Sequence, residues 1–308
     1  MNDGVRPWIE VDWSKFDPWR VQGPFRHRVT EHPLLQWDSL MELGKRLEPL
    51  GQFRTHTNQA AAGTSFNDAP RLYRSRKSAT EVIAHLSDAD AWMSLLNVQT
   101  DPVYRGLVDE ILDSVRPGID AIDPGMSYRA GWIFMASPNT VTPYHFDTEH
   151  SFILQLQGHK TLYVWDPQDL EAASEHVRDR FHAYHDRSLL VWRDELRERA
   201  HKFRLEPGVG AYMPCTSPHL VENDDNPSLT MSFTFYTDST RRSAGLHRMH
   251  ARLRKLGVTP PPIGKHPVLD AAVYGIYRGR YILKGGLRRL AGRPVEREDG
   301  PYALAKFN

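Results

Sequence analysis

Hydrophobic and polar residues alternate with different periods along the chain, and this change predicts which parts are helical. Before residue 125, apolar residues recur mostly every three or four positions, a spacing that is typical of helices packed on one face. We predict helices at 38–47, with Asp38 as its cap, from Ser78 onward, at 89–96 and at 103–115. Residues 1–30 are rich in Trp, Pro and Arg without a clear period, which predicts an arm laid over the surface.

Strand patterns dominate from Met126 to about Thr237. Short apolar segments separated by turn residues predict a β-sandwich or barrel. We predict strands at 131–135, 151–156, 161–165 and 229–236. Gly158 and His159 predict a two-residue hairpin between the second and third of these strands. A charged segment, 167–203, interrupts the strands and is predicted to be helical at 170–180 and 193–202.

Helical periodicity returns after residue 240. It covers 246–256 and, beyond a proline-rich break, 268–290. No internal repeat or low-complexity linker separates these parts. We therefore predict a single β core with helical additions at both ends. The predicted divisions are an N-terminal arm and helical lead packing on the barrel (1–125), a catalytic core with the insert 167–203 (126–240), and a basic helical region (241–308).

Composition excludes several classes of protein. The chain has 308 residues, of which 40% are hydrophobic and 25% charged, as in ordinary globular proteins. It has no run of 18 apolar residues, and its N-terminus lacks a basic-then-apolar signal, so we expect no membrane contact and a cytoplasmic location. Cys215 is the single cysteine, which excludes an internal disulfide framework and a thiolate-rich zinc site. We expect Cys215 to be a small buried hydrophobe.

The net charge of +1 hides an asymmetry. Residues 241–308 carry 15 Lys and Arg against 4 Asp and Glu, whereas the preceding 240 residues carry 24 against 34. A basic tail can bind nucleic acid or an acidic partner. We favour docking on the acidic body of the chain or on a second subunit, and we expect no nucleic-acid partner. The basic cluster 71–77 is interpreted as a solvated face.

The segment 142–147 contains candidate metal ligands. If it is extended, His145 and Asp147 leave the same face of the strand, because side chains alternate with a period of two. His219 is the candidate for a third ligand from another strand. Two histidines and one carboxylate leave three positions of an octahedron open, as in non-haem iron(II) oxygenases. By itself the His-x-Asp pair is weak evidence for a metal site, since such pairs are common on protein surfaces.

Lys160 is the second unusual position. On the predicted strand it shares a face with Leu162 and Val164. If this aliphatic face lines the barrel, the Lys160 ammonium needs an anionic partner or must lose its proton. The far carboxylate of 2-oxoglutarate would be such a partner. Alternatively, Lys160 lies at the open end of its strand and reaches water.

Taken together, the residues from Thr142 through Pro167 resemble JmjC-type oxygenases of the cupin superfamily. The likeness is greatest to the asparaginyl-hydroxylase-like branch and its bacterial cupin-like relatives, and it extends over roughly 126–237. It implies a mainly β fold, with a double-stranded β-helix (jelly-roll) core. It implies that Fe(II) is held by the catalytic residues His145, Asp147 and His219. It also implies that Lys160 and Thr142 bind 2-oxoglutarate and that O₂ is the oxidant.

Two positions depart from the pattern of the family. Ser232 and Ser151 stand where relatives have asparagine, at positions that contact cosubstrate or water. Ser232 is kept as a cosubstrate-binding candidate, and Tyr128 is a weaker candidate for lining the same pocket. His150 could support the metal or be an alternative ligand, although we favour a residue at the pocket rim or surface.

The implied activity couples decarboxylation of 2-oxoglutarate to succinate with hydroxylation of a protein side chain or small molecule; hydroxylation at a nitrogen-bound carbon would end in demethylation. One alternative is a non-catalytic cupin module that binds a ligand or regulates a partner. Another is a metal cupin with a different reaction. The intact ligand set argues against the first alternative, and Lys160 argues against the second. The basic C-terminal helices resemble, in position, the dimerisation helices of the branch, so we expect a homodimer. The primary substrate is not specified by the sequence.

Overall fold

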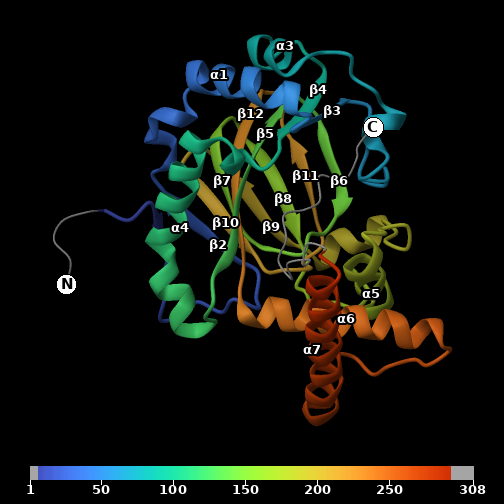
Figure 1. Ribbon diagram of the computed structural model, residues 1–308. Coiled ribbons are helices and arrows are strands. Elements are labelled where there is room, and N and C mark those ends of the chain that lie inside the picture. The colour runs from blue at the N-terminus through green and yellow to red at the C-terminus, as the bar shows by residue number, and fades with distance from the viewer. Residues whose placement is uncertain (1–5, 293–308) are drawn as a thin grey trace.

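The computed structural model describes residues 6–292 and is built around antiparallel strands (Figure 1). The strands are β1 (Ile9–Glu10), β2 (Gln22–His27), β3 (Phe53–Thr57), β4 (Ala91–Leu95), β5 (Ser127–Ala136), β6 (Val141–His145), β7 (His150–Gln157), β8 (Lys160–Val164), β9 (His201–Leu205), β10 (Val209–Met213), β11 (His219–Asn223) and β12 (Ser228–Tyr236). Eight of them form one sheet in the order β1-β2-β10-β7-β12-β5-β4-β3, and four form a second in the order β6-β11-β8-β9.

The two sheets face each other and share an apolar core. Ile153 of the large sheet packs with Leu162 and Val164 of the small sheet. The next residue along β7, Leu154, faces the other way and joins a core with helices, as the two-residue period of a strand requires. This sandwich of antiparallel sheets confirms the predicted mainly β, jelly-roll core.

Helices cover the outer face of the large sheet and extend below the small one (Figure 1). The α-helices are α1 (Trp37–Leu47), α2 (Ala69–Leu72), α3 (Ala79–Ala84), α4 (Pro102–Ile122), α5 (Glu175–Tyr184), α6 (Asp238–Lys255) and α7 (Pro267–Leu290). The 3₁₀ helices are η1 (Val29–Glu31), η2 (Pro33–Leu35), η3 (Glu48–Leu50), η4 (Val98–Thr100) and η5 (Asp194–Arg199). α1, α3 and α4 pack on the large sheet. Ser78 starts α3 with a reciprocal capping box, as its sequence predicts.

Three predictions for the N-terminal part were wrong. The segment 89–96 is not a helix but contains β4, which is entirely buried and pairs with β3 and β5. A strand buried on both faces loses its polar alternation, so its pattern does not distinguish it from a helix. Residues 6–30 are not a surface arm, because β2 pairs with β10 and Phe16 is buried in the core. Asp38 lies inside the first turn of α1, and Gln36 is the cap.

The connection at Gly158 and His159 is also different from the prediction. β7 and β8 belong to different sheets, so this turn crosses between sheets and does not close a hairpin. Gly158 has φ +71°, and a Cβ there would overlap the carbonyl oxygen of Pro227. The positive φ explains why glycine stands at this turn, whereas the predicted pairing of the two strands was wrong.

The insert 167–203 is helical, but its helices are shifted and shorter than predicted. α5 covers Glu175–Tyr184 in place of 170–180, and η5 is a 3₁₀ helix over Asp194–Arg199. His201 and Lys202 belong to β9.

The C-terminal helices follow the predicted segments, although α6 begins earlier, after a cap at Thr237. Tyr277 of α7 packs against Gly245 of α6. Residues 1–5 and 293–308 lie outside the described part, including the end of the predicted basic region. In residues 6–292 no helix is both long enough and apolar enough to cross a membrane. The division at residues 125 and 240 stays a prediction, although β1 to β4 extend the same sheet as the core.

Candidate active site

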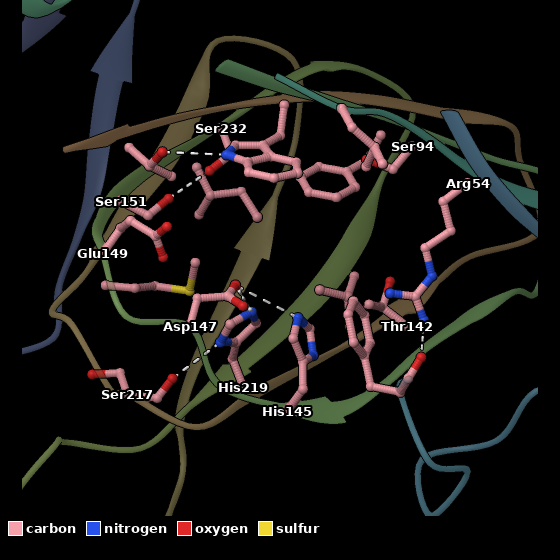
Figure 2. A pocket seen from close by; sticks show the side chains of 18 of the residues that line it. Arg54, Ser94, Thr142, His145, Asp147, Glu149, Ser151, Ser217, His219 and Ser232 are labelled. Atoms are coloured by element: carbon pink, nitrogen blue, oxygen red, sulfur yellow. Dashed lines mark hydrogen bonds and ion pairs between the residues drawn. The ribbon is translucent and has the colours of Figure 1, made fainter. Parts of the chain in front are cut away.

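The two predicted histidine ligands are direct neighbours across the small sheet. His145 ends β6 and His219 begins β11, and the antiparallel register pairs these two residues. Their ring centroids are 4.1 Å apart. Asp147 follows β6 by two residues, and its Oδ2 lies 3.8 Å from Nε2 of His145 and 3.9 Å from Nε2 of His219. The structure thus brings the three side chains together on one side of the cavity (Figure 2).

Backbone carbonyls fix the orientation of both imidazoles. Nδ1 of His145 donates to the carbonyl oxygen of Pro143 at 2.7 Å, and Nδ1 of His219 donates to that of Ser217 at 3.0 Å. A carbonyl can only accept, so the proton lies on Nδ1 and the Nε2 lone pair points toward Asp147. Burial lowers the pKa of both histidines, which keeps them neutral. Neutral nitrogens oriented in this way are the form that binds a metal ion.

Arg187, in the insert, contacts the carboxylate of this triad. Its guanidinium donates to Oδ1 of Asp147 at 2.9 Å and to the carbonyl oxygen of Phe146 at 2.9 Å. It also donates to Oδ1 of Asn67 at 2.9 Å and stacks on the Phe181 ring at 4.0 Å. Because Arg187 binds Oδ1, the other oxygen of Asp147 is left facing the two histidines.

A cavity of about 140 Å³ between the two sheets opens onto the triad. Lys160 lines it and is 4% exposed. Its ammonium donates to the hydroxyl of Thr230, which in turn donates to Oε1 of Gln155 at 2.8 Å. Loss of hydration alone lowers the pKa of Lys160 to about 7, with no contribution from a carboxylate among the described residues. Lys160 therefore points into the barrel and does not reach water at the end of its strand.

Thr142 and Ser232 also line this cavity. The Thr142 hydroxyl accepts a hydrogen bond from the indole of Trp92 at 2.9 Å, so its own proton can be donated elsewhere. The hydroxyl of Ser232 lies 2.5 Å from that of Ser151 (Figure 2). The two serines that depart from the family pattern are therefore partners of each other.

Two weaker candidates lie elsewhere. Tyr128 does not line the cavity; it stacks on Tyr236, with 4.9 Å between ring centroids. His150 is fully buried outside the cavity, which contradicts both a rim position and a ligand role. Its Nδ1 accepts from the Tyr212 hydroxyl at 2.7 Å and from the backbone of Cys215 at 3.2 Å. Cys215 is buried as predicted, and burial raises the pKa of its thiol to about 12, which leaves it unreactive.

Sequence reasoning missed three charged residues of the cavity: Arg54, Glu149 and Arg187. Arg54, on β3, lies over the Phe66 ring at 4.1 Å, and Phe66 stacks on His145 at 3.7 Å. In Figure 2, Arg54 and Glu149 lie on opposite sides of the triad. Burial and the nearby Asp147 charge raise the pKa of Glu149 to about 8. The alternation of 145, 147 and 149 could have indicated Glu149, whereas no local pattern marks the two arginines.

The triad fits a non-haem iron(II) site. It offers two imidazole nitrogens and one carboxylate oxygen, all within 4.8 Å of one another. These ligands lie at the boundary of a cavity, so ligand positions remain open for other molecules, which distinguishes the site from a closed structural zinc site.

One family model and several solved structures match parts of this chain. Residues 122–242 match the family model of the JmjC domain. Solved structures of YcfD, a ribosomal oxygenase from Escherichia coli, are similar: the complex with cobalt and succinic acid has 16% identity and a TM-score of 0.42 over 90% of this chain and 63% of that one. The complex with cobalt and 2-oxoglutarate has 18% identity and a TM-score of 0.38 over 72% and 52%.

The DMSP lyase DddQ from Ruegeria pomeroyi has 14% identity and a TM-score of 0.24 over 35% of this chain and 38% of that one. The chain thus spans between about a third and two thirds of the length of the structures it matches. A comparison with curated proteins found none that matches. Residues 122–242, which include the strands that carry the triad, therefore resemble the JmjC domain.

Proposed function

We propose that this chain is an Fe(II)- and 2-oxoglutarate-dependent oxygenase that hydroxylates a protein side chain or a small molecule. The observation that carries the proposal is the buried ammonium of Lys160 in the same cavity as the triad. A buried cation without a carboxylate partner is unfavourable unless an anion binds beside it. A dicarboxylate that reaches from the triad to Lys160 would provide a ligand for the metal site at one end and an anionic partner for the ammonium at the other.

The residues of the cavity have separable roles. His145, Asp147 and His219 would hold Fe(II), which, when bound, supplies the redox chemistry that couples oxidative decarboxylation of 2-oxoglutarate by O₂ to hydroxylation. Lys160 and Thr142 bind the far carboxylate, one by charge and the other by a hydroxyl proton.

Residues around these groups hold them in position. Trp92 orients the Thr142 hydroxyl, and Arg187 keeps one oxygen of Asp147 away from the ligand position. Ser232 and Ser151 form a polar wall of the cavity. The apolar side chains between the sheets exclude water from the reacting groups.

Two alternatives are less well supported. A non-catalytic module that binds a ligand would not need two histidines held in the metal-binding tautomer. A metal cupin with a different reaction would not need a buried lysine that faces the ligand cavity.

Three further points belong to this proposal. The exposed apolar side chains of Ile276, Leu283 and Leu287 on α7 support a homodimer formed through the C-terminal helices. We expect no membrane or nucleic-acid partner, and a cytoplasmic location stays a prediction.

The test is to add Fe(II) and 2-oxoglutarate to the full chain without oxygen and to record the visible spectrum. We expect a charge-transfer band from bidentate 2-oxoglutarate, and succinate once air is admitted. Lys160→Ala should weaken 2-oxoglutarate binding far more than Fe(II) binding. Absence of both the band and succinate in a folded sample would rule out the oxygenase.

A further inference from the structure

A second cluster of histidines and carboxylates lies between α5 and α6, which pack against each other. Glu175 and Asp179 are four residues apart on α5, and His247 and His250 are three residues apart on α6. Each spacing places its pair on one face of a helix. None of the four lines the active-site cavity. Two carboxylates of α5 and two imidazoles of α6 therefore lie together outside the active-site cavity.

Three of the four side chains, those of Glu175, Asp179 and His250, have possible ligand atoms as close together as those of the active-site triad, and His247 adjoins both carboxylates. Nδ1 of His247 lies 2.8 Å from Oδ1 of Asp179 and 3.9 Å from Oε2 of Glu175. Nδ1 of His250 lies 3.9 Å from the same Asp179 oxygen. Atoms of Glu175, Asp179 and His250 all lie within 4.8 Å of one another. Ligand atoms around a tetrahedral zinc ion are about 3.4 Å apart, given bonds near 2.1 Å, so only small side-chain movements separate this arrangement from a coordinated one.

Two of these atoms have unused hydrogen-bonding capacity. Oε2 of Glu175 and Nδ1 of His250 are buried and have no hydrogen-bond partner among the described residues. His250 is 3% exposed. A buried polar atom without a partner is costly, and such atoms in native proteins usually have an ion or water beside them. Both atoms face the same small region, next to Oδ1 of Asp179.

The remaining carboxylate oxygens already have cationic neighbours. Arg254 donates to Oδ2 of Asp179 at 2.7 Å, and Arg178 lies 3.9 Å from Oε1 of Glu175. The arginines thus leave Oδ1 and Oε2 to the histidines. Even with these arginines present, burial raises the pKa of both carboxyl groups, and burial lowers the pKa of both histidines. A divalent cation would stabilise two ionised carboxylates and two neutral imidazoles together.

We propose that Glu175, Asp179, His247 and His250 form a second metal site, which binds Zn²⁺ or a similar divalent transition-metal ion with a structural role. Four protein ligands close the coordination of such an ion, unlike the three of the active site. Binding replaces the proton that Nδ1 of His247 shares with Asp179. The ion would link α6 to the insert that carries Arg187, and this inference does not depend on the proposed oxygenase activity.

The experiment uses Co²⁺ as the probe, in the full-length Asp147→Ala variant, whose active-site triad is broken. We expect one equivalent of Co²⁺, with the intense visible bands of tetrahedral coordination, and a higher melting temperature when Zn²⁺ is added. His250→Gln in the same background should lower the affinity at least tenfold and remove the bands. The matched control is His176→Gln, an exposed histidine of α5, which should keep both signals.

Two results would overturn the proposal. One is a folded Asp147→Ala chain that binds no stoichiometric Co²⁺. The other is a His250→Gln variant that retains the bands. Either result would mean that the four side chains form a hydrogen-bonded network and not a metal site. If His250→Gln does not fold, the Zn²⁺-dependent melting temperature and zinc content of Asp147→Ala, before and after chelation, decide the question. Succinate production enters none of these readouts, so failure of the oxygenase proposal is detected separately.

Discussion

The active-site triad and the α5–α6 cluster use the same kinds of side chain and differ in what surrounds them. In the triad, Asp147 is 43% exposed and lies at the boundary of a cavity. In the second cluster, Asp179 is fully buried between two helices and has a second carboxylate beside it. The number of protein ligands and the access to the ion decide whether a site can react with other molecules or only stabilise the fold.

The two regions also obtain their geometry in different ways. His145 and His219 come together through strand register, 74 residues apart in the chain, and backbone carbonyls orient their rings. The second cluster depends on helical spacing, and the Asp179 carboxylate orients the imidazole of His247. A strand register is held by a whole sheet, so the triad should keep its geometry without a metal, whereas the helix pair should gain stability from one.

The largest expected effect comes from Asp147→Ala. We expect succinate formation to fall by at least about a thousandfold, because two imidazoles alone hold Fe(II) poorly in the cavity. Succinate can be quantified by mass spectrometry. His250→Gln provides the reciprocal case, since it should keep the anaerobic Fe(II)–2-oxoglutarate band. If His250→Gln removed the band while the chain stayed folded, the second cluster would affect the active site. This would contradict the independence that their separate positions predict.

Lys160→Met should have opposite effects on binding and stability. Methionine has a similar length and no charge, so 2-oxoglutarate affinity should fall about a hundredfold, the equivalent of about 3 kcal/mol for a lost buried ion pair. The ligand-free chain should become more stable by roughly 1–3 kcal/mol, because an unpaired buried ammonium is removed. Isothermal titration and urea unfolding measure the two changes. A ligand-free variant that is clearly less stable than the parent would contradict this account of Lys160.

The same residue predicts a pH dependence of stability. In the unfolded chain Lys160 keeps its proton up to its ordinary pKa of 10.5, whereas in the folded, ligand-free chain its pKa is lowered to about 7. Between these values the unfolded state binds more protons, so the contribution of Lys160 to the free energy of unfolding increases as the pH rises. This contribution should be absent in Lys160→Met. Urea unfolding at several pH values, with the difference between parent and variant taken at each pH, isolates it.

Arg187→Gln should have a smaller effect on turnover, about 10- to 100-fold, as expected for a group that positions a metal ligand. The glutamine retains a donor to Asp147 but not the charge or the simultaneous bond to Phe146. The Fe(II)–2-oxoglutarate band should shift in energy, a change that a purely structural role would not produce. Arg187→Lys should recover part of the turnover. Co²⁺ binding at the second cluster should not change.

The sequence was sufficient for features that depend on local spacing and insufficient for those that depend on sheet pairing. The period of two placed His145 with Asp147 and Lys160 with Leu162, and the helical period identified α6 and α7. β4 was missed because a strand buried on both faces has no alternation. Arg54 and Arg187 reach the cavity from β3 and from the insert, and nothing in their immediate sequence indicates this. Asp179 and His247 of the second cluster are 68 residues apart, so their pairing also required the fold.

Trp92→Phe should give the smallest effect and tests the outer support of the cosubstrate site. Phenylalanine keeps an aromatic ring next to His56, which stacks on Trp92 at 4.8 Å, but it removes the indole donor to Thr142. One neutral hydrogen bond is worth about 1 kcal/mol, so the KM for 2-oxoglutarate should rise about fivefold with little change in kcat. Trp132→Phe is the matched control, because the Trp132 indole lines the same cavity but donates to Thr234. An equal rise in KM for both variants would mean that cavity packing, and not the orientation of Thr142, controls cosubstrate binding. A selective rise for Trp92→Phe would place the hydrogen-bonded support of 2-oxoglutarate on β4, a strand outside the matched JmjC region.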